Sequence, residues 1–220
     1  ERLNRIALER KQKPITVQIP DEIVVSELAL RLKATVAEVV KKAFLMGTMV
    51  TATDTIDFDT ASLIAMEFHA KVEKEVVVTT EDGKRVSLKP SNRIVYDFEI
   101  KFNHPAIGQQ KFHFDYSIEE YKESIAKART FGFLHEVQYL RSIGLALGGS
   151  MENAIVLDET KILNPEGLRY EDEFVRHKIL DAIGDMALLE YTMIGEYEAV
   201  AGSHHLNHLL TKKLYEDKDN

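Results

Sequence analysis

Several features are missing from this chain of 220 residues, and each absence excludes a class of protein. There is no cysteine, which excludes a disulfide scaffold, a metal site held by cysteine and a cysteine nucleophile. No apolar run approaches the roughly 18 residues of a membrane-spanning helix. The charged start, residues 1–13, also lacks the apolar core of a signal peptide. We therefore expect a soluble, cytoplasmic protein without a membrane span.

Basic residues are outnumbered in this sequence. Against 28 Lys and Arg stand 36 Asp and Glu, which gives a formal net charge of −8. A protein that coats nucleic acid needs a basic surface, so this balance argues against that class. Hydrophobic residues make up 45% and charged residues 29% of the chain, as is typical of a folded globular protein.

Composition changes near residue 79. All eight histidines except His69 lie after residue 100, and the run 79–84 is polar and turn-forming. Within that run, Asp82-Gly83 is a dipeptide typical of tight turns. We therefore predict two domains, residues 1–78 and residues 79–220.

The first domain has the pattern of a small helical module with short flanking strands. Alternating apolar and polar residues predict a strand over 15–19, and a second strand is expected over 72–78. Helices are expected to begin at three capping residues, namely Ser26, Thr35 and Asp59. Thr35 and Glu38 form a capping box, and Gly47 is placed to end that helix.

The spacing within two of these helices predicts which residues face the core. They are Val39, Val40, Ala43 and Phe44 in the second helix, and Ala61, Leu63, Ile64 and Phe68 in the third. The expected result is a compact module with no catalytic residue.

Several short sequence motifs between residues 13 and 78 occur in an order that matches a known family. They are 24–29 (VVSELA), 38–42 (EVVKK), 46–52 (MGTMVTA) and the helix from Asp59. Together they resemble the small N-terminal module of bacterial translation initiation factor 2. The resemblance implies a non-catalytic appendage that assists contact with the ribosome or another partner. The sequence contains no G-x-x-x-x-G-K-[ST] loop of the kind that binds GTP.

The second domain has strands first and then helices with short strands between them. Strands are expected over 85–88, 94–102, 111–116, 154–157, 161–163 and 192–200, and helices over 117–129, 135–142, 172–190 and from His205. This order predicts a two-layer α/β sandwich, so that the whole chain belongs to the α+β class.

One run on the expected helix 172–190 is suited to metal chemistry. His177 and Asp181 are four residues apart, so they share a helix face and suit two ligands of one zinc ion. Lys178 is turned roughly 100° away and could reach a substrate oxygen. Asp185, one turn further on, could orient a neighbouring histidine. A surface ion pair between His177 and Asp181 explains the same spacing.

Three histidines gather in the run 202–208 (GSHHLNH). They suit a general acid on a mobile loop, or a second metal pair formed by His204 and His208. A solvated start of a helix accounts for them equally well.

Read together, the motifs of the second domain fall in one order. They are 103–108 (NHPAIG), 128–133 (ARTFGF), 144–150 (GLALGGS), 163–164 (LN), 166–169 (EGLR) and 172–185 (DEFVRHKILDAIGD). Over about residues 80–218 they closely resemble the C-terminal half of the zinc-dependent UDP-3-O-acyl-N-acetylglucosamine deacetylases of lipid A synthesis.

This resemblance implies a role for each matching residue. His177 and Asp181 match zinc ligands, and Lys178 matches a lysine that contacts the nucleotide-sugar lipid substrate. His204 matches a charged partner or general acid, which is held by the carboxylate that matches Asp185.

The resemblance also implies a passage for the acyl chain, lined by Thr130, Phe131 and a βαβ insert around 148–154. Because a sister domain covers this region in the family, we expect apolar surface around Phe131, Phe133 and the insert to be exposed. Self-association through that face is one consequence.

The sequence departs from the family in one respect. The family uses an adjacent Glu-His pair as general base and third zinc ligand, and no Glu-His dipeptide occurs in this chain. The nearest candidate, His135-Glu136, has the reverse order. A catalytic zinc needs three protein ligands and a base for the attacking water, so the site is incomplete within these residues.

We therefore interpret the chain as a hybrid of an initiation-factor-like module and a deacetylase-derived domain. One hypothesis is a metal-dependent amide hydrolase domain that is inactive alone. The other is a binding or structural protein that keeps the fold without the catalysis.

Overall fold

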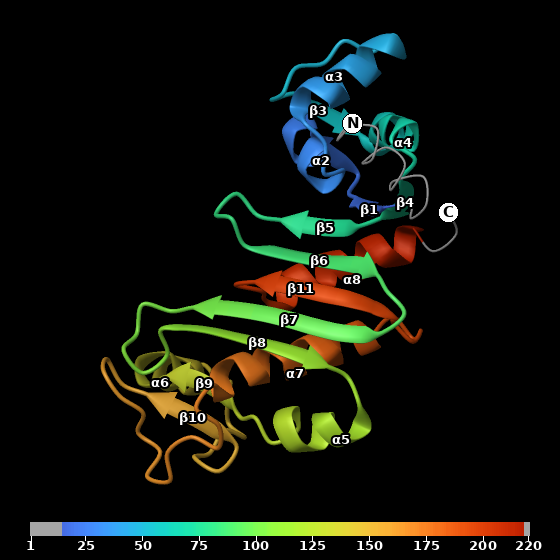
Figure 1. Ribbon diagram of the computed structural model, residues 1–220. Coiled ribbons are helices and arrows are strands. Elements are labelled where there is room, and N and C mark those ends of the chain that lie inside the picture. The colour runs from blue at the N-terminus through green and yellow to red at the C-terminus, as the bar shows by residue number, and fades with distance from the viewer. Residues whose placement is uncertain (1–14, 218–220) are drawn as a thin grey trace. The chain divides into compact units, whose positions relative to one another are not determined.

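The computed structural model describes residues 15–217, and the charged first residues lie outside this range. The chain divides into two compact units. The first runs up to Val77 and includes Leu88–Pro90, and the second comprises Val78–Ser87 and the residues from Ser91 onward. Helices and several sheets occur together, which confirms the predicted α+β class (Figure 1).

Among its described residues, from 15 onward, the first unit combines three helices with two small two-stranded sheets. Its elements are β1 (Thr16–Ile19), β2 (Glu22–Val24), α2 (Val25–Arg31), α3 (Val36–Leu45), β3 (Thr55–Asp57), α4 (Phe58–Glu67) and β4 (Lys71–Lys74). Strand β1 pairs in parallel with β4, and β2 pairs antiparallel with β3. The core between these elements is aliphatic, with Ile19, Leu28 and Ile64 fully buried.

Two local predictions in this unit are confirmed. The Thr35 side chain accepts a hydrogen bond from the Glu38 backbone N–H, and the Glu38 carboxylate accepts one from the Thr35 backbone N–H. This capping box starts α3. Gly47 follows the helix with a φ of 87°, a left-handed conformation that glycine adopts without strain.

Two other predicted caps are wrong. Helix α2 follows β2 directly, so Val24 stands at the N-cap position and Ser26 lies inside the helix. Helix α4 is capped by Asp57, two residues before Asp59, because the Asp57 carboxylate accepts a hydrogen bond from the Thr60 N–H. In each case the preceding strand fixes the start of the helix.

The buried faces of α3 and α4 are narrower than the sequence analysis predicted. Val39 and Ala43 are buried, but Phe44, one residue beyond Ala43, is 64% exposed. Leu63 of α4 is 54% exposed, whereas Ile64 beside it is buried. Because successive helix residues are turned about 100° apart, a narrow buried stripe leaves such neighbours on the solvent side.

The strand expected over 72–78 is two strands, β4 and β5 (Val76–Thr79). Glu75 separates them: its N–H donates to the Ile19 carbonyl, and its fully buried carboxylate accepts from Arg31 at 2.7 Å. A glutamate with a fully buried side chain therefore separates the two strands.

The second unit holds most of a five-stranded sheet. Its further elements are β6 (Arg85–Pro90), β7 (Ile94–Lys101), β8 (Gln109–Asp115), α5 (Ile118–Glu120), the π-helical turn η1 (Tyr121–Ile125), β9 (Thr130–Phe133), α6 (Leu134–Ser142), β10 (Ala154–Leu157), α7 (Glu173–Ala187), β11 (Gly195–Val200) and α8 (His204–Asp217). The strand order is β5-β6-β11-β7-β8, with β11 parallel to β7 and β8 antiparallel to it. Helix α7 contacts β7, β8 and α8, which gives the predicted two layers (Figure 1).

Three segments of this unit differ from the prediction. The helix expected over 117–129 is reduced to α5 and η1, although Ser117 caps it by accepting from the Glu120 N–H. The strand expected over 161–163 is a single bridge between Leu157 and Ile162. Helix α7 ends at Ala187, a few residues earlier than expected.

Strands β9 and β10 pair in parallel with α6 between them, which forms the expected βαβ insert. Contrary to the prediction, Phe131 and Phe133 are half-buried. The Phe131 ring meets Phe174 edge-on, with centroids 5.0 Å apart, so α7 covers it. Apolar surface is nevertheless exposed around the insert, as expected, and the exposed side chains are Leu134, Tyr139, Ile143, Leu145, Leu147 and Met151.

Over residues 15–217, no helix combines the length and apolar character that crossing a membrane requires.

Candidate functional site

Helix α7 carries the predicted ligand pair on the side away from its buried apolar stripe. His177 Nε2 lies 3.1 Å from Asp181 Oδ1, and both side chains are largely buried. The pair lies there because α7 is anchored by an apolar stripe that turns its other face outward. That stripe consists of Phe174, Val175, Ile179, Ala182 and Met186.

The Nδ1 side of the His177 ring contacts the backbone. Its Nδ1 lies 3.2 Å from the carbonyl oxygen of Ala128, just before β9. Since a carbonyl only accepts, Nδ1 is the donor in this contact. A histidine that ligates a metal through Nε2 usually donates its other N–H in this way.

Asp181 lies between three cationic or potentially cationic groups. Its Oδ2 is 3.4 Å from Lys178 Nζ and 3.8 Å from His204 Nε2. Burial alone would raise the pKa of Asp181, but the hydrogen bond from His177 and the charges of Lys178 and His204 outweigh it, so that the pKa is lowered. The carboxylate therefore stays ionised, as a metal ligand must.

Helical spacing suggested that Lys178 points away from the pair, but its side chain does not. Besides its contact with Asp181, its Nζ lies 5.6 Å from the centre of the Phe131 ring. The cation thus joins α7 to β9, the strand that also carries the exposed residue Thr130.

The structure brings His204 and Asp185 together. His204 Nδ1 lies 2.8 Å from Asp185 Oδ2, although the histidine side chain is 67% exposed. The same carboxylate oxygen accepts from Asn207 Nδ2 at 2.8 Å, and Tyr197 O–H donates to Asn207 Oδ1 at 2.6 Å.

Asn207 and Tyr197 are site-supporting residues that the sequence analysis missed. Both are almost fully buried. Burial and the nearby Tyr96 and Asp185 raise the pKa of Tyr197, so its hydroxyl remains a proton donor. The sequence analysis expected only a strand over 192–200, and nothing in that pattern indicated a hydrogen bond from Tyr197 to α8.

Gly202 sets the place where α8 begins. A Cβ at this position would lie 2.7 Å from Phe98 Cζ, far inside normal contact. The preceding Ala201 has a φ of 52° and donates its N–H to the Glu99 carbonyl. Close packing on β7 therefore places His204, two residues later, beside α7.

Other sequence candidates are not part of this group. His208 is exposed on α8, and His135 stacks on Phe133 with ring centres 6.0 Å apart. In the described part of the chain, no three His, Asp or Glu side chains are placed to share one metal ion.

The pair His177 and Asp181 nevertheless fits two positions of a zinc site. With bonds of about 2.0 Å in a tetrahedron, two ligand atoms lie roughly 3.3 Å apart, close to the 3.1 Å observed. Nδ1 of the histidine is already engaged, and Nε2 faces the carboxylate.

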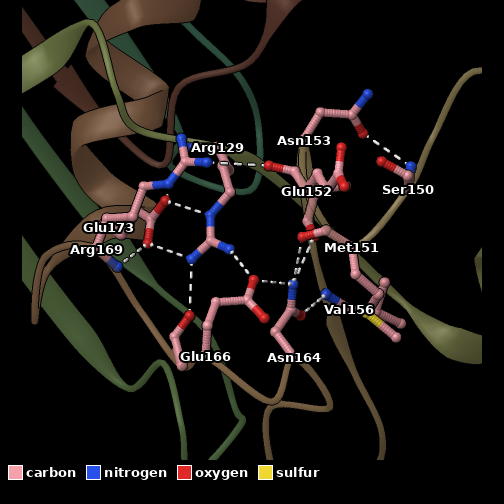
Figure 2. A network of polar contacts seen from close by, with 12 residues as sticks. Arg129, Ser150, Met151, Glu152, Asn153, Val156, Asn164, Glu166, Arg169 and Glu173 are labelled. Carbon is pink, nitrogen blue, oxygen red and sulfur yellow. Dashed lines mark hydrogen bonds and ion pairs between the residues drawn. The ribbon is translucent and has the colours of Figure 1, made fainter.

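A buried polar network supports the base of α7 (Figure 2). The Glu173 carboxylate accepts from Nε and Nη2 of Arg129 at 2.9 and 3.0 Å, and both side chains are almost fully buried. Arg129 Nη1 donates to Glu166 at 2.6 Å, and Asn164 bonds to the backbone of Met151, Ala154 and Val156. The network joins α7 to β10 and to Arg129, the residue directly before β9.

Comparison with known proteins gives two family matches. Residues 52–216 match the model of the UDP-3-O-acyl N-acetylglycosamine deacetylases. Residues 20–71 match the N-terminal region of translation initiation factor IF-2, and the two matches overlap. The resemblance to both families is thereby confirmed, although the deacetylase match begins well before residue 80.

Curated relatives support the deacetylase match. The UDP-3-O-acyl-N-acetylglucosamine deacetylase of Aliarcobacter butzleri is 84% identical over 150 residues, which is 68% of this chain and 50% of the relative. The enzyme of Nitratiruptor sp. is 63% identical over the same shares, and that of Sulfurimonas denitrificans is 58% identical over 74% of this chain and 56% of its own. The chain spans about half the length of the curated relatives it matches.

Proposed function

Because the chain belongs to the family of UDP-3-O-acyl N-acetylglycosamine deacetylases, we propose that its second unit is the part of such an enzyme that binds zinc through His177 and Asp181. The observation that carries this proposal is the 3.1 Å contact between His177 Nε2 and Asp181 Oδ1, with His204 and Asp185 beside it. Two ligands and a carboxylate-held histidine on one surface suit metal-assisted amide hydrolysis better than an isolated surface ion pair does.

His177 and Asp181 would hold the zinc ion, which when bound would polarise the amide carbonyl and lower the pKa of bound water. The chain's own residues prepare the rest. His204 gives Nδ1–H to Asp185, so Nε2 is the nitrogen that remains to deliver a proton to the leaving amine. Asn207 and Tyr197 fix the Asp185 oxygen that orients this ring.

Lys178 and β9 are proposed to bind the substrate. The Lys178 ammonium lies between Asp181 and the Phe131 ring, where it can donate to a substrate oxygen. Thr130 is exposed at the start of the same strand. The exposed apolar side chains of α6 and the following loop, among them Tyr139 and Leu147, offer a surface to an acyl chain.

We propose that the 220-residue polypeptide by itself has no deacetylase turnover. Its sequence offers no Glu-His dipeptide to act as base and third ligand. Two protein ligands predict weak zinc binding, which a second chain would strengthen by adding a third.

The first unit is proposed to be a non-catalytic helical module. The match of residues 20–71 to the N-terminal region of translation initiation factor IF-2 supports its derivation from such a module. In this view the chain joins two pieces of different origin. A binding or structural protein that keeps the deacetylase fold without the chemistry is the alternative.

Substrate binding and turnover together test the proposal. UDP-3-O-acyl-N-acetylglucosamine should bind to the purified chain without being deacetylated. Lys178→Ala should weaken this binding, whereas Lys122→Ala, at an exposed lysine of η1, should leave it unchanged. Turnover near that of an intact family member, abolished by a chelator, would show that another residue completes the site. Absence of any substrate binding would favour the structural alternative.

A further inference from the structure

A buried histidine joins the turn between β7 and β8 to the βαβ insert. His104 is 7% exposed and belongs to the run 103–108 (NHPAIG), to which the proposed function assigns no role. Its Nδ1 lies 3.1 Å from the backbone nitrogen of Ala106, and its Nε2 lies 2.9 Å from the backbone carbonyl oxygen of Asp158. The two ring nitrogens thus contact two separate parts of the chain.

These contacts define the role of each ring nitrogen. The backbone N–H of Ala106 donates, so Nδ1 accepts and carries no proton. The carbonyl of Asp158 accepts, so Nε2 carries the proton and donates it. A neutral ring with its proton on Nε2 therefore satisfies both contacts at once.

Both parallel strands of the insert end at this histidine. Phe133 is the last residue of β9, and its ring centre lies 5.6 Å from that of His104. Asp158 directly follows β10, whose last residue, Leu157, is paired in register with Phe133. One imidazole therefore contacts the ends of both strands, where the insert meets the turn between β7 and β8 (Figure 1).

The other end of the insert is held by the buried polar network (Figure 2). There, Arg129 directly precedes β9 and bonds to the Glu173 carboxylate, and Asn164 bonds to the first residue of β10. Between the two ends lie α6 and the loop to β10, which carry exposed apolar side chains. Since Phe133 is also the N-cap residue of α6, its contact with His104 bears on where this helix begins.

We propose that His104 is a positioning residue, which holds the far end of the insert against the β7–β8 turn and thereby sets the place of the apolar surface on α6 and the following loop. The holding contacts are the Nε2–H bond to Asp158 and the packing of the ring on Phe133. The use of this surface by an acyl chain rests on the proposed function, but the hold on the insert does not.

Asparagine separates the two hydrogen bonds of the ring. Its side-chain oxygen can accept from the N–H two residues further along the chain, as in an Asx turn, but it is too short to reach Asp158. His104→Asn should therefore keep the local turn and release the insert, whereas His104→Ala should lose both hydrogen bonds. His113→Asn is the matched control, because this exposed histidine lies on β8 and bonds to Asp97 of β7.

Hydrogen exchange of the full chain measures how firmly the insert is held. The amides of β9 and β10 should exchange about 5-fold faster in His104→Asn and in His104→Ala, as expected for the loss of one hydrogen bond. The amides of α7 should keep their wild-type rates, and His113→Asn should change neither set. Wild-type rates in a folded His104→Asn overturn the proposal. Equal acceleration in α7 also overturns it, because His104 would then support the whole unit rather than the insert.

A spectrum of the wild-type chain covers the case in which neither His104 variant folds. Long-range ¹H–¹⁵N correlations, assigned from the backbone amide of His104, show which nitrogen of the ring carries the proton. At neutral pH, the bond to Asp158 predicts a neutral ring with its proton on Nε2. Any other form of the ring overturns the proposal.

Ligand binding tests the link to the proposed function. Compared with the wild type, His104→Asn should bind UDP-3-O-acyl-N-acetylglucosamine several-fold more weakly and bind the same nucleotide sugar without its acyl chain equally well. Unchanged binding of the acylated ligand, or equal weakening for both ligands, would show that His104 does not position the acyl-chain surface. If the wild-type chain binds neither ligand, the proposed function fails, while the exchange rates still decide whether His104 holds the insert.

Discussion

Each unit buries one glutamate completely against an arginine, and the two pairs differ in what else they hold. In the first unit, Glu75 accepts from Arg31, which also donates to the Gln18 carbonyl at 2.6 Å and to the exposed Glu27. In the second unit, Glu173 accepts from Arg129 and in addition from the backbone next to His177. A buried ion pair is therefore not by itself a sign of function. The difference lies in whether the pair reaches a peptide that touches a site residue.

The surroundings of the two arginines also differ. Arg31 keeps 23% of its side chain exposed, whereas Arg129 keeps 2%. Burial would lower the pKa of Arg31, but Glu75 and Glu27 outweigh it and raise the pKa. For Arg129, the hydrogen bond to Glu173 is the main cause of its raised pKa. We therefore expect loss of the Glu173 carboxylate to lower the free energy of unfolding more than loss of the Glu75 carboxylate does.

Glu173→Ala should cause the largest loss of stability. It leaves the Arg129 guanidinium buried with only Glu166 and a carbonyl as partners, and breaking a buried pair in this way costs about 3–5 kcal/mol. Urea unfolding, followed by probes within the second unit, measures the loss. A change below about 1 kcal/mol would mean that the network contributes little to the fold.

Glu75→Ala should cost less, about 1–3 kcal/mol, and should affect the first unit. Arg31 remains partly solvated and keeps Glu27 at 2.5 Å, so its charge is not stranded. Unfolding probes in the first unit provide the readout, and the imidazole signals of His177 should not change. A cost equal to that of Glu173→Ala would remove the energetic contrast between the two pairs.

Gly202→Ala should cost about 1–3 kcal/mol in the second unit, because the added Cβ meets Phe98 at 2.7 Å. The start of α8 would then shift, and His204 should lose its contact with Asp185. The His204 imidazole signals report this loss. Gly184→Ala is the matched control, since nothing lies within 4 Å of a Cβ at that position. Equal behaviour of the two variants would contradict this account of how α8 is placed.

Acid should weaken the second unit through Glu173. Burial raises the pKa of this carboxyl, but hydrogen bonds from the Arg129 side chain and from the backbone N–H groups of Arg129 and Arg169 outweigh it, and the pKa is lowered. Because the pKa of Glu173 is lower in the folded than in the unfolded chain, its ionised carboxylate stabilises the fold fully above the ordinary glutamate pKa of about 4.3. This stabilisation is lost as the pH falls from that value through the lowered pKa of the folded state. Unfolding free energies measured between pH 6 and pH 3 should fall less steeply in the chain with both Arg129→Met and Glu173→Met than in the wild type. Glu171→Gln, at an exposed position nearby, should retain the wild-type slope.

Thr35→Ala should have the smallest effect, about 1 kcal/mol in the first unit, because it removes the side-chain half of one capping box. It should not alter the second unit. Circular dichroism during thermal unfolding is sufficient to test this, and a larger loss would show that α3 depends on its cap more than on its packing.

Local sequence signals predicted much of the fold. The capping box at Thr35, the strands over β7 and β8 and the helix α7 follow from periodicity and capping patterns, which act over a few residues. The predictions that Ser26 and Asp59 cap helices were wrong, because the strands before them fix where α2 and α4 begin. Glu75 was not recognised as a buried charge because its partner Arg31 is distant in sequence.

The site shows the same limit. The spacing of His177, Asp181 and Asp185 predicted one helix face, and the structure agrees. It could not predict that Lys178 turns back to Asp181, that Tyr197 and Asn207 hold Asp185, or that Ala128 presents a carbonyl to His177. These contacts join β9, β11 and α8 to α7, and no short-range pattern specifies how those elements meet.

Zinc titration by calorimetry tests the central claim most directly. The account predicts weak one-to-one binding to the wild-type chain that disappears in His177→Ala and is unchanged in His135→Ala, whose histidine lies on α6. Tight, submicromolar one-to-one binding that persists in His177→Ala would contradict it, because the metal would then be held by residues other than the α7 pair.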